Sequence, residues 1–203
     1  MILLVVYLIL IFIAAYLIGS IPTGYIVVKK LAGTDIRQTG SGSTGATNVK
    51  RVLGTKWFFA VLLIDVLKGI IPVYIAHKYF NYISCEGLSP VLAALGTIIG
   101  HSKSIFLKFT GGKSVATGVG TMLALCWPVG LILGAIWGSI TYTTKYVSLG
   151  SIIAVSLAPL LMTAFNYNCY YVTFAVICAV YVIVRHKDNI KRLLNGTENK
   201  VRE

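Results

Sequence analysis

Acidic residues are scarce in this 203-residue chain, which has six Asp and Glu residues against eighteen Lys and Arg residues and a formal net charge of +12. Charged residues of both signs make up only 12% of the sequence, whereas a soluble domain has roughly 25%. Together with 57% hydrophobic residues, this composition excludes an ordinary soluble domain and predicts a polytopic membrane protein.

Several other features are missing. No stripe interleaves basic with aromatic residues, so we expect no nucleic-acid partner and attribute the positive charge to cytoplasmic loops and an anionic substrate. Cys85, Cys126, Cys169 and Cys178 form no C-x-x-C pair and have no nearby histidine, so we expect no metal and no cofactor. The N-terminus lacks a basic segment and a small-residue cleavage site, so no removable signal peptide is predicted.

Long apolar segments supply the fold prediction: an all-α integral membrane bundle of about seven transmembrane helices, with the N-terminus outside and the C-terminus cytoplasmic. We predict a single domain over 1–203, with helices over 1–28, 52–76, 88–102, 113–126, 128–144, 148–165 and 169–185 and a cytoplasmic tail over 186–203. This topology places every Lys and Arg except Lys68 and Lys78 on the inner side. A five-span alternative would put Lys103, Lys108 and Lys113 outside.

The second predicted span carries two charged residues, Asp65 and Lys68, which are three positions apart and so share one helical face. Charges at membrane depth are costly unless they are paired or face a polar cavity. Two interpretations stay open from the residues alone: a neutralised pair that locks the bundle, or a part of the functional site.

The segment 39–51 is the first candidate site, because it combines three glycines with hydroxyl side chains and ends on Lys50 and Arg51. Glycines let consecutive backbone N–H groups turn toward one anion. Ser41, Ser43 and Thr44 add hydroxyl donors, and Arg51 offers a fork that suits phosphate. The segment is either a phosphate cradle at the membrane surface or a flexible, solvated connection.

The second candidate is Gly111-Gly112-Lys113, which follows the polar stretch from His101 and opens a helix at Ser114. Backbone N–H groups at a helix N-terminus, beside a lysine, bind anions. The spacing is not that of a P-loop. The predicted topology puts both candidates, together with Ser148, His186 and Asn189, on the cytoplasmic face. Chemistry joining a phosphorylated polar substrate to a lipid is indicated, although acyl transfer, phosphoryl transfer and organic-anion transport all fit.

Motifs in a specific order extend this interpretation. They lie at 19–24 (GSIPTG), 40–51 (GSGxxGATNxxR), 65–69 (DxxKG), 100–101 (GH), 109–117 (FxGGKxVAT), 186–193 (HxxNIxRL) and 196–198 (GTE). In these motifs the chain resembles the bacterial acyl-phosphate-dependent glycerol-3-phosphate acyltransferase family, PlsY. The resemblance implies seven membrane helices and transfer of an acyl group from acyl phosphate to the 1-position of glycerol-3-phosphate. The products are lysophosphatidic acid and phosphate, in the first acylation of phospholipid synthesis.

The resemblance also implies site residues and partners. The catalytic candidates are Ser41, Arg51, Lys113, His186 and Asn189. The substrate-binding candidates are Ser43, Thr47, Asn48, Gly111, Gly112, Ser148 and Glu198. Implied partners are acyl phosphate, glycerol-3-phosphate, membrane lipid and a functional link to the enzyme that forms acyl phosphate. The implied location is the bacterial inner membrane, with the active site on its cytoplasmic face.

Three positions depart from the family pattern. Ser43 stands where Asn is usual, Ser104 where Pro often follows Gly-His, and Ser114 where Gly often follows Gly-Gly-Lys. None of these changes removes a cation or His186, so we expect activity to be retained.

A mixed anhydride is already activated, so no covalent enzyme intermediate is required. His186 is then either a general base or, as the resemblance favours, a group that orients substrate while acyl phosphate takes the proton. The H-x-x-x-x-D pair of thioester-dependent acyltransferases is absent from the sequence. Two rival functions are an organic-phosphate transporter and a structural subunit.

Overall fold

The computed structural model describes residues 2–81, 86–166 and 168–201, so Cys85 and Arg202 lie outside the described residues. These ranges contain helices and one isolated bridge between Ser104 and Thr110, with no strand, which confirms the all-α fold class. Two compact units make up the chain, Met1–Leu125 and Cys126–Glu203.

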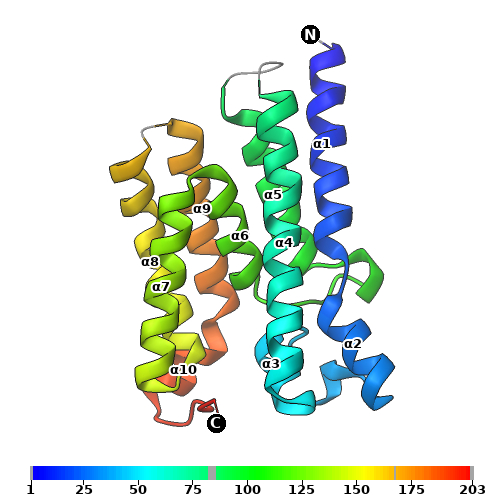
Figure 1. The fold of residues 1–203 in the computed structure, drawn as a ribbon, viewed down its shortest axis with the longest axis vertical. Helices are drawn as coiled ribbons and strands as arrows, with labels where there is room; N and C mark the ends of the chain where they lie inside the picture. The colour runs from blue at the N-terminus through cyan, green and yellow to red at the C-terminus, as the bar shows by residue number, and fades with distance from the viewer. Residues whose placement is uncertain (1, 82–85, 167, 202–203) are drawn as a thin grey trace. The chain divides into compact units, whose positions relative to one another are not determined.

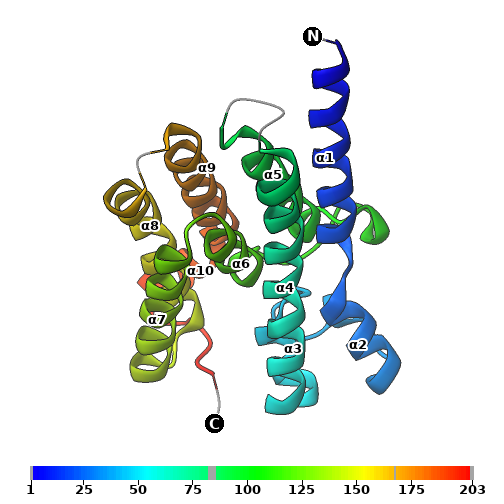
Figure 2. The same ribbon diagram turned by 45° about the horizontal axis from the view of Figure 1, so that its top comes forward.

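The described part of unit 1 contains six α-helices and two short 3₁₀ helices. They are α1 (Ile2–Ser20), α2 (Thr23–Ala32), η1 (Ile36–Gln38), α3 (Ala46–Leu53), α4 (Thr55–Phe80), α5 (Leu88–Ser102), η2 (Ile105–Leu107) and α6 (Val115–Leu125). The range predicted as one helix, 1–28, holds two, and α2 turns away from the axis of α1 (Figures 1 and 2). Pro22 lies at this break because it lacks an N–H group and its ring disfavours the preceding helical turn.

Among the residues that the structure describes, three stretches are long and apolar enough to cross a membrane: Ile2–Ala32, Thr55–Phe80 and Val147–Phe165. A fourth is reached if α9 (Cys169–Arg185) and α10 (Lys187–Leu194), bent by 61°, are counted as one span. The helices α5 and α6 are apolar but shorter. Seven spans therefore remain a prediction.

Glycines allow the helices of unit 1 to pack closely. A Cβ on Gly96 would lie 2.6 Å from the Phe12 carbonyl oxygen of α1, and one on Gly100 would lie 2.8 Å from the Ser20 nitrogen. In the same way, a Cβ on Gly120 of α6 would overlap the Val66 carbonyl of α4. Small residues at such crossings are a common packing device of membrane helices, and here they let α5 pack closely against α1 and α6 against α4.

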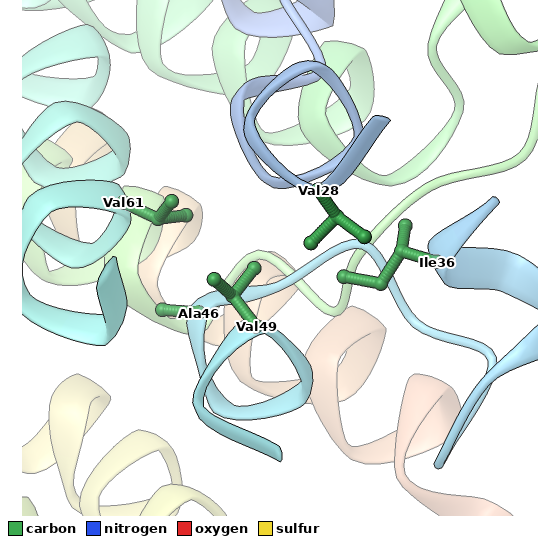
Figure 3. Packing of buried hydrophobic residues seen from close by; sticks show 5 residues of the cluster. All are labelled: Val28, Ile36, Ala46, Val49 and Val61. Atoms are coloured by element: carbon green, nitrogen blue, oxygen red, sulfur yellow. The ribbon is translucent and has the colours of Figure 1, made fainter. Parts of the chain in front are cut away.

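A small apolar core lies beneath the first glycine-rich segment (Figure 3). It contains Val28 of α2, Ile36 of η1, Ala46 and Val49 of α3, and Val61 of α4, all buried. Trp57 and Phe58 pack against it. Because η1 and α3 both contribute to this core, the two ends of segment 39–45 are held in place, which disfavours the flexible-connection interpretation.

Unit 2 contains α7 (Trp127–Thr144), α8 (Val147–Phe165), α9 and α10, followed by the tail. Polar positions gather where α8 begins, where α9 meets α10, and in the tail. The backbone N–H of Val201 donates to the Lys145 carbonyl over 2.8 Å. The tail therefore folds back onto the start of α8 instead of extending away from it.

Candidate active site

The first glycine-rich loop is organised by Asn48, whose side chain is only 1% exposed. Its amide Nδ2 donates to the carbonyls of Ile36 (3.2 Å), Thr39 (3.0 Å) and Ser43 (2.9 Å). Its Oδ1 accepts from the Ser41 backbone N–H at 3.1 Å. Asn48, a predicted substrate-binding residue, is thus occupied inside the loop and shapes it.

We expect Asn48→Ala to destabilise the protein by about 2–4 kcal/mol, because the carbonyls of Ile36, Thr39 and Ser43 and the Ser41 N–H would each lose a hydrogen bond. The measurement is thermal unfolding in detergent. Asn48→Asp is the informative comparison, since it keeps the acceptor for Ser41 but replaces the donor with a negative group facing carbonyls. Asn48→Asp should lower the unfolding temperature at least as much as Asn48→Ala does. An Asn48→Asp protein as stable as wild type would contradict the assigned hydrogen bonds.

Glycine is required at Gly40 and Gly42, which adopt φ of 55° and 68°. A Cβ on Gly40 would overlap Asn48 Oδ1 and lie 3.4 Å from the Arg51 Cδ. The Arg51 side chain therefore passes beside Gly40, and it is exposed. Ser41 is also exposed. The loop backbone, the Ser41 hydroxyl and the Arg51 guanidinium therefore lie together on an accessible surface of unit 1. Thr47 is half-buried.

A second cation, Arg37, was missed by sequence reasoning. It forms a salt bridge with Asp35 (2.6 Å), and its Nη1 lies 3.5 Å from the Thr110 hydroxyl, at the edge of the second loop. The hydrogen bond from Arg37 lowers the pKa of Asp35. Arg37 thus links the two loops within unit 1. The D-x-R spacing of Asp35 and Arg37, beside a glycine-rich segment, was the sequence feature that could have identified Arg37.

The second loop runs from Lys103 to Ser114 and is anchored by two serines. Ser104 Oγ donates to the Ser20 carbonyl (2.6 Å), and Ser114 Oγ donates to the Ile98 carbonyl (2.8 Å). Both serines are buried. Ser114 has φ of 62°, a left-handed conformation that favours glycine. Its hydrogen bond gives a physical reason why serine is accommodated at this departure from the family pattern.

Lys113 follows Gly111 and Gly112 and is half-buried, just before the N-terminus of α6. The Gly112 N–H donates to the His101 carbonyl at 3.1 Å. Cβ atoms at Gly111 and Gly112 would overlap the His101 carbonyl and the His101 Nε2, respectively. The loop therefore wraps closely around His101, which fixes the base of the Lys113 side chain.

Glu198 brings together two other predicted site residues of unit 2, Ser148 and Asn189. Its Oε1 accepts from Ser148 Oγ (2.8 Å) and Asn189 Nδ2 (2.7 Å), and its Oε2 accepts from Arg192 Nε (2.7 Å). The Glu198 side chain is 5% exposed. A carboxylate repels phosphate, so this geometry favours Glu198 as the residue that positions Ser148 and Asn189. Sequence reasoning missed Arg192, although its spacing from Asn189 was a signal.

Burial raises the pKa of Glu198, but hydrogen bonds from Asn189, Arg192 and Ser148 outweigh burial and hold the pKa below its ordinary value of 4.5. A carboxyl with a lowered pKa stabilises the folded state above its unfolded pKa, and this contribution is lost as the pH falls through the folded value. We expect protease accessibility of residues 196–201 to stay constant from pH 7 to 5 and to rise below that ordinary value. In Glu198→Gln the tail should be accessible already at pH 7, and an equally protected tail would contradict the assigned role.

His186 caps α9 and precedes α10, and it is 3% exposed. Its Nδ1 lies 2.8 Å from the Val182 carbonyl. Because a carbonyl only accepts, this contact places the ring proton on Nδ1, and the neutral ring then carries its acceptor on Nε2. Asn189, 6% exposed, follows one turn later. Among the described residues, no group of His, Cys, Asp and Glu could hold a metal ion.

Known proteins resemble this chain over most of its length. The sequence profile of the family described as glycerol-3-phosphate acyltransferase matches residues 9–196. A glycerol-3-phosphate acyltransferase of Trichormus variabilis is 44% identical over 202 residues, covering 93% of this chain and 89% of its own. One of Fusobacterium nucleatum is 49% identical over 185 residues, covering 91% and 93%.

Two solved structures are also similar. One is PlsY, an integral membrane glycerol 3-phosphate acyltransferase, in its glycerol 3-phosphate form, with a TM-score of 0.89 and 39% identity. The other is its lysophosphatidic acid form, with a TM-score of 0.87 and 38% identity. Each comparison covers 96% of this chain and 95% of the solved one.

Proposed function

Because this chain belongs to the glycerol-3-phosphate acyltransferase family, we propose that it transfers a fatty acyl group from acyl phosphate to the 1-hydroxyl of glycerol-3-phosphate. The hydroxyl oxygen attacks the acyl carbonyl, the bond from that carbon to the phosphate oxygen breaks, and the hydroxyl proton leaves with inorganic phosphate. The other product is lysophosphatidic acid. The observation that supports the proposal is the pair of glycine-rich loops, each with a cation beside it, in one apolar helical unit.

Unit 1 supplies the phosphate-binding groups in this proposal. Arg51, Ser41 and the backbone of the first loop bind one phosphate, while Lys113 and the backbone of Gly111 and Gly112 bind the phosphate of glycerol-3-phosphate. Charge grows on the departing phosphate, so fixed cations stabilise the transition state. Ser43 and Thr47 border the first loop. The shaping of that loop by Asn48 is supported by the four hydrogen bonds of its amide.

Unit 2 supplies the groups that orient the hydroxyl. His186 would accept the hydroxyl hydrogen bond through Nε2, and Asn189 and Ser148 would be held by Glu198. Support comes from the contact of Nδ1 with Val182 and from the three hydrogen bonds of Glu198. In this assignment His186 orients and acyl phosphate takes the proton, which needs no covalent intermediate.

The proposal includes a bacterial inner-membrane location, seven spans, an outside N-terminus and a cytoplasmic C-terminus. The bias of Lys and Arg toward the predicted inner loops supports it. Both substrates would then meet at the cytoplasmic face, the acyl chain entering from lipid, and the enzyme that forms acyl phosphate would be the functional partner.

The test uses purified protein in detergent micelles with labelled glycerol-3-phosphate and one of two donors, acyl phosphate or acyl-CoA. We expect labelled lysophosphatidic acid only with acyl phosphate, one phosphate released per lipid formed, and the acyl group at the 1-position. Activity with acyl-CoA alone would overturn the donor assignment. Uptake of glycerol-3-phosphate into protein-containing vesicles without a donor would favour the transporter instead.

A further inference from the structure

A buried polar cluster in unit 1 has no part in the proposed chemistry. It contains Asp65 and Lys68 of α4 and His101 of α5, which are 1%, 6% and 7% exposed. Ionisable groups inside an apolar helical unit are costly and are retained where they are paired or serve the site. The question is what these three side chains hold in place.

Lys68 has a structural explanation. Its Nζ lies 2.8 Å from Asp65 Oδ1 and donates to the Ile21 carbonyl over 2.9 Å. That carbonyl is at the break between α1 and α2, next to Pro22, where regular helical hydrogen bonding stops. Lys68 therefore stabilises the break, and Asp65 neutralises the charge of Lys68.

His101 has a different position. Its Nδ1 lies 3.8 Å from the same Asp65 Oδ1 that pairs with Lys68. Its Nε2 lies where a Cβ of Gly112 would be, and its carbonyl accepts from the Gly112 N–H over 3.1 Å. One residue thus contacts the buried acid through one edge of its ring and the second glycine-rich loop through the other edge.

We propose that His101, oriented by Asp65, is a positioning residue for the Gly111–Lys113 segment and so sets where the Lys113 amine is presented. This inference rests on the proposed function of Lys113 as a phosphate-binding cation. Two adjacent glycines leave a loop with many accessible conformations, and an ordered anion site needs one of them. The imidazole ring restricts the loop at Gly112, because it fills the space where a side chain of that residue would lie, while the His101 backbone carbonyl lies against Gly111.

Steric overlap gives a sharp test. Gly112→Ala places a methyl group on the His101 ring, so it should impair the site, and His101→Ala in the same chain should make room for that methyl group. Gly111→Ala is the matched control, because its methyl group would overlap the His101 backbone carbonyl, which His101→Ala leaves in place. The readouts are KM for glycerol-3-phosphate, KM for acyl phosphate, kcat and Tm in detergent.

We expect His101→Ala to lower kcat/KM for glycerol-3-phosphate by about 10- to 100-fold, mainly through KM, with KM for acyl phosphate changed less than twofold. His101→Gln, which keeps a polar planar group, should recover part of the loss. The double variant His101→Ala/Gly112→Ala should exceed Gly112→Ala alone in activity and in Tm, whereas His101→Ala/Gly111→Ala should not exceed Gly111→Ala.

An unchanged KM for glycerol-3-phosphate in His101→Ala would overturn the inference, as would a double variant no better than Gly112→Ala alone. If His101→Ala does not fold, the KM values for the two substrates are compared in His101→Gln instead. A lower kcat together with equal increases of both KM values in that variant would mean that His101 has only a structural role. A wild-type protein without acyl transfer would refute the proposed function itself, so the two failures are distinguishable.

Discussion

Lys113→Ala should reduce acyl transfer by about 10²- to 10³-fold, because a fixed charge that stabilises a developing phosphate charge is removed from the transition state. The half-buried lysine contributes its charge at the end of a loop held by His101 and Ser114. The measurement is the rate of lysophosphatidic acid formation by purified protein.

The matched control is Lys103→Ala, which removes an exposed lysine from the same loop region and should leave the rate within about twofold of wild type. Lys113→Arg keeps the charge but changes its geometry, so it should recover only part of the activity. Thermal unfolding should be similar for Lys113→Ala and wild type. A Lys113→Ala protein that is folded and fully active would contradict the assigned phosphate site.

His186→Ala should also cost about 10²-fold or more in kcat, because the hydroxyl loses the group that orients it. The contact of Nδ1 with Val182 fixes the ring, and Nε2 is its acceptor. If His186 orients without taking the proton, His186→Gln should retain much of the activity, since an amide oxygen accepts the same hydrogen bond. The measurement is the pH dependence of kcat for the three proteins.

The Gln variant separates the two mechanisms. If His186 only orients the hydroxyl, activity should persist in His186→Gln, because an amide oxygen accepts the hydrogen bond without taking a proton. A general base must bind a proton, and an amide cannot. His186→Gln as inactive as His186→Ala would therefore contradict the orienting role and identify His186 as the base.

The sequence was sufficient for the features that depend on local composition. Apolar segments predicted an all-helical chain, and the glycine-rich segments were recognised as candidate loops before any contact was known. The break at Pro22 follows from proline chemistry, although 1–28 was predicted as one helix. The seven spans stay untested, because length and hydropathy assign at most four spans among the described residues and leave α5, α6 and α7 unassigned.

Functional detail that depends on distant contacts could not be predicted. Ser148 and Glu198 are fifty positions apart and share a hydrogen bond, so the carboxylate could be assigned to substrate from its motif but not to positioning. Asn48 looked like a substrate ligand for a similar reason, since only three-dimensional geometry shows that its amide is used within the loop. The sequence left Asp65 between two interpretations, and the structure adds its distances of 2.8 Å to Lys68 and 3.8 Å to His101, on which the proposed role rests.

The account depends on both proposed phosphate-binding loops facing the cytoplasm from one side of the membrane. The most direct measurement replaces the native cysteines, introduces Gln38→Cys or Lys103→Cys beside the first or second loop, and labels each with a membrane-impermeant maleimide in right-side-out and inverted vesicles. Both positions are exposed. We predict that both are labelled only in inverted vesicles. Labelling of either position from the outer face, or of the two positions from opposite faces, would contradict the account.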